Sequence, residues 1–181
     1  MLSKEIANPS EAGGNAMNKI KKILAPTDLS ALSRAGVRYA LETAAASGSE
    51  VILYNVVGFY EAQPYYEFED AYVAEQIPTV KEVIEEHRKH LAGFLDKHFA
   101  DVAAHAKVRL EVAVGRPYQQ IVEKAAKENV DLIVISTHGR TGLFHTLIGS
   151  VAEKVVRLAA CPVLTVRPEN EAALDRARAA A

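Results

Sequence analysis

Short apolar runs of strand length alternate along this chain with segments of helical periodicity. The run at 51–57 is almost continuously hydrophobic, which is typical of a strand buried on both faces of a parallel sheet. Comparable runs lie at 20–25, 108–114, 131–135 and 162–166. Because parallel strands need long crossovers, the alternation predicts a single doubly wound α/β domain, with a five-stranded parallel sheet and helices on both faces.

The segments between these runs carry helix signals. Ser30 is the expected N-cap of a helix that ends at Gly48, and Pro117 suits the first turn of another helix. An apolar stripe with helical spacing occupies 80–95, and a further helix is expected over 150–159. With right-handed crossovers, we expect the strand order 3-2-1-4-5.

Turn-forming residues and a lack of periodicity set the ends of the chain apart from this domain. We expect a mobile N-terminal tail over 1–17, the folded domain over 18–168, and an Ala- and Arg-rich C-terminal tail over 169–181. The aromatic and acidic segment 60–72 is expected to form a solvated lid or to flank a dimer interface.

Composition argues against several classes of protein. The formal net charge is -2, so a basic face for nucleic acid is not expected. No apolar run approaches the roughly 18–20 residues that span a membrane, and the N-terminal sequence lacks the apolar stretch of a secretory signal. One cysteine, Cys161, leaves no internal disulfide pair and suits a reducing compartment. We therefore expect a soluble cytoplasmic protein.

Two loops rich in small and polar residues follow the first and fourth strands. They span 26–28 and 136–150. In the order 3-2-1-4-5 these two strands are neighbours at the point where the winding reverses, and ligands bind at the carboxyl ends of strands there. The sequence therefore predicts a ligand site between the two loops.

The second loop has the residues of an anion-binding site. Ser136 and Gly139 lack bulk and allow a tight backbone whose N–H groups point inward. Gly149 leads into Ser150 at a helix start, where free N–H groups and the helix dipole favour negative charge. Arg140 can add a positive charge. The pattern indicates phosphate binding without a catalytic side chain.

Each of these signals also has a purely structural interpretation. Ser150 and Glu153 have the spacing of a capping box. Asp28 can accept hydrogen bonds from ribose hydroxyls, or it can cap the turn into the next helix. Val56 can pack against an adenine ring, or it can be an ordinary core residue. Spacing alone leaves both interpretations open.

Three long motifs nevertheless carry a resemblance that covers 19–167. They are Ile-Leu-Ala-Pro-Thr-Asp at 23–28, the glycine-containing stretch at 139–155, and Cys-Pro-Val-Leu-Thr-Val-Arg at 161–167. In these motifs the chain resembles the universal stress protein family. In the ATP-binding branch of that family the loop has glycine, two residues, glycine, nine residues, glycine, and then serine or threonine; here Ser136 replaces the first glycine.

The resemblance implies which residues hold a ligand. Its adenosine would be lined by Pro26, Thr27, Asp28 and Val56, with the Asp28 carboxylate on the ribose. Its phosphates would be surrounded by Ile135, Ser136, Gly139, Arg140, Gly149, Ser150 and Val151. The ligand would be ATP or AMP, with or without Mg²⁺. The resemblance also implies a homodimer in which strand 162–166 pairs with its counterpart.

Neither metal ligands nor catalytic residues are assigned from the sequence. His87 and His90 lie three apart on a helix without a second ligand pair, so we expect His87 to be packed or hydrogen-bonded. His138 lies in the glycine loop with no evident partner to orient it as a base. Cys161 is expected to be a small buried hydrophobe and not a redox nucleophile.

Three functions remain open at this point. The first is a stress-response or signalling module whose unidentified protein partner depends on bound nucleotide. The second is a slow ATPase or phosphotransferase that uses Mg²⁺ with His138 or Asp28. The third is a ligand-free dimeric interaction protein in which Ser136 has closed the pocket.

Overall fold

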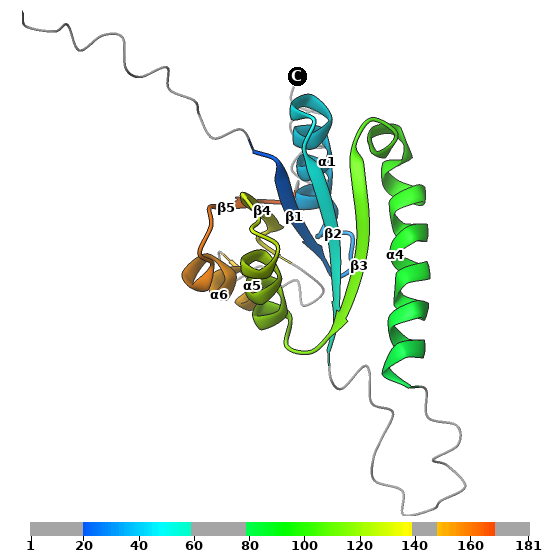
Figure 1. The fold of residues 1–181 in the computed structure, drawn as a ribbon, viewed down its shortest axis with the longest axis vertical. Coiled ribbons are helices and arrows are strands. Elements are labelled where there is room, and N and C mark those ends of the chain that lie inside the picture. The colour runs from blue at the N-terminus through cyan, green and yellow to red at the C-terminus, as the bar shows by residue number, and fades with distance from the viewer. Residues whose placement is uncertain (1–19, 59–78, 139–147, 169–181) are drawn as a thin grey trace, which may run out of the picture.

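The computed structural model describes residues 20–58, 79–138 and 148–168. Both expected tails, the segment 60–72, Gly139 and Arg140 lie outside these ranges. The elements are β1 (Lys22–Thr27), α1 (Arg34–Ser47), β2 (Glu50–Val57), α4 (Val80–Ala103), β3 (Lys107–Val114), α5 (Pro117–Lys127), β4 (Leu132–Ser136), α6 (Ser150–Leu158) and β5 (Val163–Val166) (Figure 1).

The strands form one parallel sheet in the order β3-β2-β1-β4-β5. This confirms the expected architecture and strand order. Helices α1 and α4 pack on one face, where Leu41 and Leu91 meet residues of β1 and β2. Helices α5 and α6 pack on the other face, where Ile121 and Val155 are buried. Successive strand residues point to opposite faces, so each central strand supplies both halves of the core.

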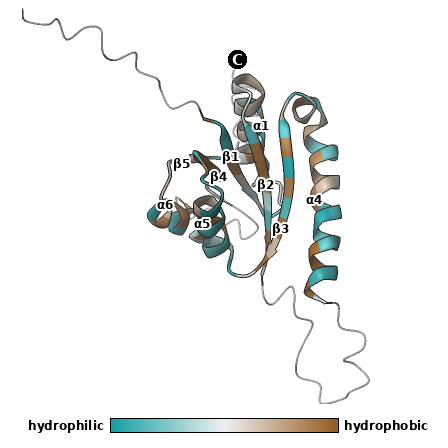
Figure 2. Cartoon of the chain, viewed as in Figure 1, coloured by the Kyte–Doolittle hydropathy of each residue, from teal (hydrophilic) through white to brown (hydrophobic). Residues whose placement is uncertain are grey.

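Strand β2 has a neighbouring strand on each side and helices on both faces, and its burial matches that position. Its segment from Val51 to Asn55 is fully buried. In Figure 2 the central strands β1 and β2 are mainly hydrophobic, while α4 and α5 carry broad hydrophilic surfaces. Gly48 ends α1 with φ 74°, a left-handed conformation that glycine adopts at little cost, as the sequence predicts.

The expected end of the first strand at Pro26 is wrong, because β1 continues through Pro26 to Thr27. The carbonyl of Lys22 accepts a hydrogen bond from Asp131, so the backbone groups of alternate residues, Leu24 and Pro26 included, face β4. Pairing with β4 reaches only Leu24↔Ile133. Because β1 and β4 no longer pair at Pro26, its missing N–H group costs the sheet no hydrogen bond.

One expected helix start is also wrong. Helix α1 begins at Arg34 and not after Ser30, because Ser30 belongs to a preceding turn in which its carbonyl accepts from the Ser33 hydroxyl at 2.9 Å. Helix α6 begins at Ser150 as expected, but Ser150 does not cap it, so the capping-box interpretation is wrong. Gly149 occupies the N-cap position, and no side-chain hydrogen bond caps that helix. Pro117, by contrast, begins α5 as expected.

Candidate functional site

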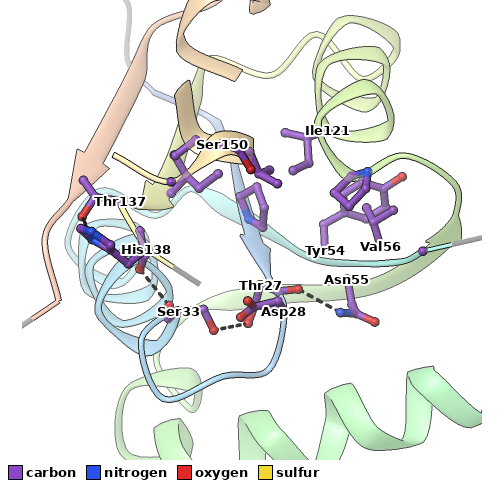
Figure 3. Close-up of a pocket in the computed structure, with 18 residues that line it drawn as sticks. Thr27, Asp28, Ser33, Tyr54, Asn55, Val56, Ile121, Thr137, His138 and Ser150 are labelled. Carbon is purple, nitrogen blue, oxygen red and sulfur yellow. Dashed lines mark hydrogen bonds between the residues drawn. The ribbon is translucent and has the colours of Figure 1, made fainter. Parts of the chain in front are cut away.

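The carboxyl-terminal halves of β1 and β4 separate and leave a cavity between them. Their register covers only Ile23↔Leu132 and Leu24↔Ile133, although the strands run on to Thr27 and Ser136. A cavity of about 270 Å³ opens at this end, between the β1–α1 loop, the end of β2 and the start of α6 (Figure 3). The switch point is thus a real hollow in the surface, as a ligand site requires.

All the proposed ligand residues that the structure describes line this cavity. They are Pro26, Thr27, Asp28, Val56, Ile135, Ser136, Gly149, Ser150 and Val151. The structure thus brings together residues from β1, β2, β4 and α6. Gly139 and Arg140 lie outside the described residues.

The loop after β1 is held by its own hydroxyl and carboxylate groups. The Thr27 hydroxyl lies 2.8 Å from the Ser33 hydroxyl and accepts a hydrogen bond from the Leu29 amide at 3.0 Å. The Asp28 carboxylate accepts from the Ser30 amide at 3.1 Å. Leu29 has φ 64°, a conformation that costs energy in a residue with a side chain and that the surrounding bonds maintain. Asp28 therefore makes the local turn contact and also lines the cavity.

The Ser136 hydroxyl is hydrogen-bonded to the first turn of α1. It accepts from the Gly36 amide at 2.9 Å and donates to the Ser33 carbonyl at 3.2 Å. Gly36 is the third residue of α1, whose own N-cap makes no side-chain bond, so the serine of β4 takes the place of that cap. A β-carbon on Gly36 would lie only 2.8 Å from the Ser136 amide nitrogen. Gly36 thus leaves the room that the serine uses.

Gly149 brings the start of α6 against the end of β4. Its amide donates to the Thr137 carbonyl at 2.6 Å, and a β-carbon on Gly149 would lie 3.1 Å from that same oxygen. Helix α6 therefore begins at the cavity wall, with Ser150 and Val151 in its first turn. The free N–H groups and dipole of a helix start favour an anion there.

Part of the cavity lining is apolar. It is formed by Val56 and Tyr54 of β2 together with Pro117 and Ile121 of α5 (Figure 3). Burial, with Glu111 nearby, raises the pKa of Tyr54 to about 12, so its phenol stays neutral. An apolar wall together with a helix N-terminus suits a ligand that joins a flat ring to an anionic group.

The family model described as universal stress protein family matches residues 19–167. The chain belongs to the universal stress protein family. It is 35% identical over 158 residues to universal stress protein MJ0531 of Methanocaldococcus jannaschii, across 87% of this chain and 88% of that protein. It is 32% identical over 158 residues to universal stress protein MJ0577 of the same organism, across 83% and 96% of the two chains.

Solved structures agree with this assignment. The structure of MJ0577 has a TM-score of 0.67 with this universal stress protein, and the match covers 84% of this chain and 99% of that one. A universal stress protein crystallised in complex with cAMP has a TM-score of 0.59 at 23% identity, across 83% and 99% of the two chains. At 23% identity, the similarity to this second structure supports the fold alone.

Other lining residues of this universal stress protein were not proposed as ligand residues from the sequence. They are Ser33, Tyr54, Asn55, Gly58, Pro117, Ile121, Thr137, His138 and Ala152. Four of them follow the strand or helix pattern and carry no separate signal: Tyr54, Pro117, Ile121 and Ala152. Asn55 does carry one, because an amide side chain interrupts the apolar run of β2. A buried polar residue in such a run needs partners, and here they lie on β1 and α4.

The sequence also singled out His87, His138 and Cys161, and the structure shows the surroundings of each. His87 lies 3.3 Å from the Asn55 amide oxygen, which confirms the expected hydrogen-bonded role. The His138 ring nitrogen Nδ1 lies 2.9 Å from the Thr137 hydroxyl. Cys161 is half-buried, less than expected, and burial raises the pKa of its thiol. Over the residues that the structure describes, no three His, Cys, Asp or Glu side chains are grouped as metal ligands would be.

Among the described residues, no helix combines the length and the apolar character needed to cross a membrane.

Proposed function

We propose that this chain binds an adenine nucleotide, ATP or AMP, in the cavity between β1 and β4. The observation that carries this proposal is one cavity with an apolar wall for a flat ring and a helix N-terminus for phosphate. Asp28, at the end of β1, would accept hydrogen bonds from the ribose hydroxyls. Gly139 and Arg140 would complete the phosphate side.

Known proteins of this fold support the choice of ligand class. A universal stress protein with the same fold has been crystallised with cAMP, which is an adenine nucleotide. The fold can therefore hold such a ligand. We further propose that the nucleotide makes the chain a cytoplasmic stress-response or signalling module. Only a ligand that binds two states with different affinity can shift the balance between them.

Mg²⁺ would bind as a complex with ATP and not to the protein alone. The described residues offer no group of three acidic, histidine or cysteine side chains that could hold the ion. The phosphate oxygens are hard ligands of the kind that Mg²⁺ prefers. We propose that Mg²⁺ strengthens the binding of ATP and leaves the binding of AMP unchanged.

The ligand-free alternative required that Ser136 close the pocket. The Ser136 hydroxyl is bonded to Gly36 and Ser33, and the cavity remains beside it. These contacts favour a site that is open to a ligand. For the enzymatic alternative, release of phosphate from ATP above background, lost in Asp28→Ala or His138→Ala protein, would be the decisive result.

The proposal is tested by calorimetric titration of ligand-stripped protein with ATP, AMP and cAMP. Val56→Trp places a large ring in the cavity and is expected to abolish the binding heat. Val80→Trp adds the same ring at an exposed site (58% accessible) on α4 and is expected to bind as the wild type does. Absence of heat with all three nucleotides would refute the proposal. Mass spectrometry of the molecule released from freshly purified, denatured protein would identify the natural ligand.

We also propose that two copies pair through β5. This strand is at the edge of the sheet, and its residues are all partly exposed. An edge strand presents unpaired backbone groups that a second copy can satisfy. An antiparallel or parallel pairing of two β5 strands would join two sheets into one.

A further inference from the structure

Asn55 forms a polar connection between the cavity and the helix α4. Its side chain is 3% exposed, and it lines the cavity from β2. The amide nitrogen donates to the Thr27 carbonyl at 2.9 Å, a bond that is visible in Figure 3. The amide oxygen lies 3.3 Å from the His87 ring nitrogen Nδ1. Residues of β1, β2 and α4 are thus joined in one chain of hydrogen bonds.

The chemistry of the three groups fixes the direction of each bond. A backbone carbonyl can only accept, so the Asn55 amide must turn its nitrogen toward Thr27. The Asn55 oxygen then faces His87 and can only accept. The His87 nitrogen Nδ1 therefore carries the proton. A flipped Asn55 would place two acceptors against each other at Thr27.

We infer that His87 is a positioning residue for the ligand site, acting through Asn55 on the peptide that joins Thr27 to Asp28. The inference rests on the proposed nucleotide binding for its functional consequence. Thr27 is the last residue of β1, and Asp28 follows it into the cavity. Within the described ranges, His87 is not among the residues that line the cavity, and its hydrogen bond to Asn55 connects it to that lining. Helix α4 thereby contributes to a site that it does not touch.

The expected effect follows from burial. A leucine at position 87 removes the donor from the Asn55 oxygen, and a buried acceptor that loses its partner is destabilised. Asn55 is then free to turn away from Thr27, and the Thr27–Asp28 peptide loses a restraint. A hydrogen bond of this kind corresponds to a change of about three- to tenfold in affinity.

The test compares His87→Leu, Asn55→Leu and the double variant with the wild type. Affinity for AMP is measured by calorimetry, and the amide resonances of Asp28 and Leu29 are recorded by NMR in ligand-free protein. His87→Leu should weaken AMP binding about three- to tenfold and shift both resonances. The double variant should be no weaker than Asn55→Leu alone, because the two side chains act in series. His87→Gln, which keeps an N–H donor, should restore most of the affinity.

A matched control is His105→Leu, since His105 is exposed just after α4. It should leave affinity and resonances unchanged. Wild-type affinity in His87→Leu, additive losses in the double variant, or no recovery with His87→Gln would each overturn the inference. If no nucleotide binds the wild type, the proposed function fails. The resonances of Asp28 and Leu29 then still decide whether His87 positions this loop, because they are read without ligand.

Discussion

Ser136 is the residue at which this chain departs from the glycine of the family's ATP-binding loop. The Ser136 hydroxyl is hydrogen-bonded to Gly36 and Ser33. It therefore caps the first turn of α1 and does not block the space between the strands. The departure therefore has a structural explanation. A side chain of β4 replaces the missing cap of a helix that lies 100 residues away in sequence.

Replacing Ser136 by glycine should lower stability and leave nucleotide affinity unimproved. The Gly36 amide would lose its partner, and losing a helix cap costs about 0.5–2 kcal/mol. Urea denaturation measures the loss, and calorimetry measures the affinity. Ser136→Ala should cost a similar amount, since it also lacks the hydroxyl. A Ser136→Gly protein that gains nucleotide binding would instead show that the serine closes the pocket.

At the scale of elements, α1 approaches β4 so closely that only glycine fits at position 36. A β-carbon there would meet the Ser136 hydroxyl at 2.9 Å and the Ser136 nitrogen at 2.8 Å. The contact is with backbone as well as side chain, so the strand and helix would have to move apart. This close packing holds the loop between β1 and α1 against the cavity.

Gly36→Ala and Gly93→Ala should therefore change stability in opposite directions. In Gly36→Ala the clash with β4 should cost about 1–3 kcal/mol, as overpacking does. Gly93 lies on the exposed side of α4 with open space around it, and Gly93→Ala should stabilise by about 0.5–1 kcal/mol through helix propensity. Thermal or urea unfolding of the two variants measures both signs. Equal effects would show that α1 can move away from β4.

Ion pairs also join the elements at the β3 edge of the sheet. Arg109 of β3 bonds Glu50 and Glu128 at 2.9 Å and 3.0 Å and also bonds Glu111. Lys124 bonds Glu111 and Glu128. The guanidinium of Arg109, then Lys124 and Lys22, holds the pKa of Glu128 well below its usual 4.5. The network joins α5 to the edge of the sheet.

Glu128→Gln should make stability less dependent on pH in the acid range. The depressed pKa means that ionised Glu128 stabilises the fold above about pH 4.5, and this contribution is lost as pH falls below that value. The glutamine variant lacks the contribution at every pH, so the fall of stability below about pH 4.5 should be shallower. Urea unfolding between neutral and acid pH measures the slope. Glu85→Gln, exposed on α4 and outside the network, should keep the wild-type slope; the same slope in both variants would contradict the role of Glu128.

At the scale of the whole molecule, the outer edge of β5 pairs with no other strand among the described residues. The carbonyls of Pro162 and Val166 accept from Ile133 and Thr137 of the neighbouring chain segment, so alternate residues face β4. Val163 and Thr165 therefore turn their backbone groups toward the free edge. That edge is the surface on which a second copy would pair.

Thr165→Pro should convert a dimer into a monomer without unfolding the domain. Proline removes an outward N–H group and is tolerated at sheet edges. Light scattering should change from about twice the 19.6 kDa chain mass to the chain mass itself. Thr165→Val keeps the N–H group and should remain dimeric. A wild type of single-chain mass would refute the dimer, and a dimeric Thr165→Pro protein would place the interface elsewhere.

The sequence by itself determined the order of helices and strands, the doubly wound sheet and the edge at which the loops converge. These depend on the local spacing of apolar residues, which each segment carries by itself, as 51–57 shows. Only the tertiary structure decided where β1 and β4 part, that Ser136 caps α1, and that Asn55 links Thr27 to His87. Those contacts join groups 28 to 100 residues apart, and a hydrogen bond depends on distances between folded elements that no local pattern specifies.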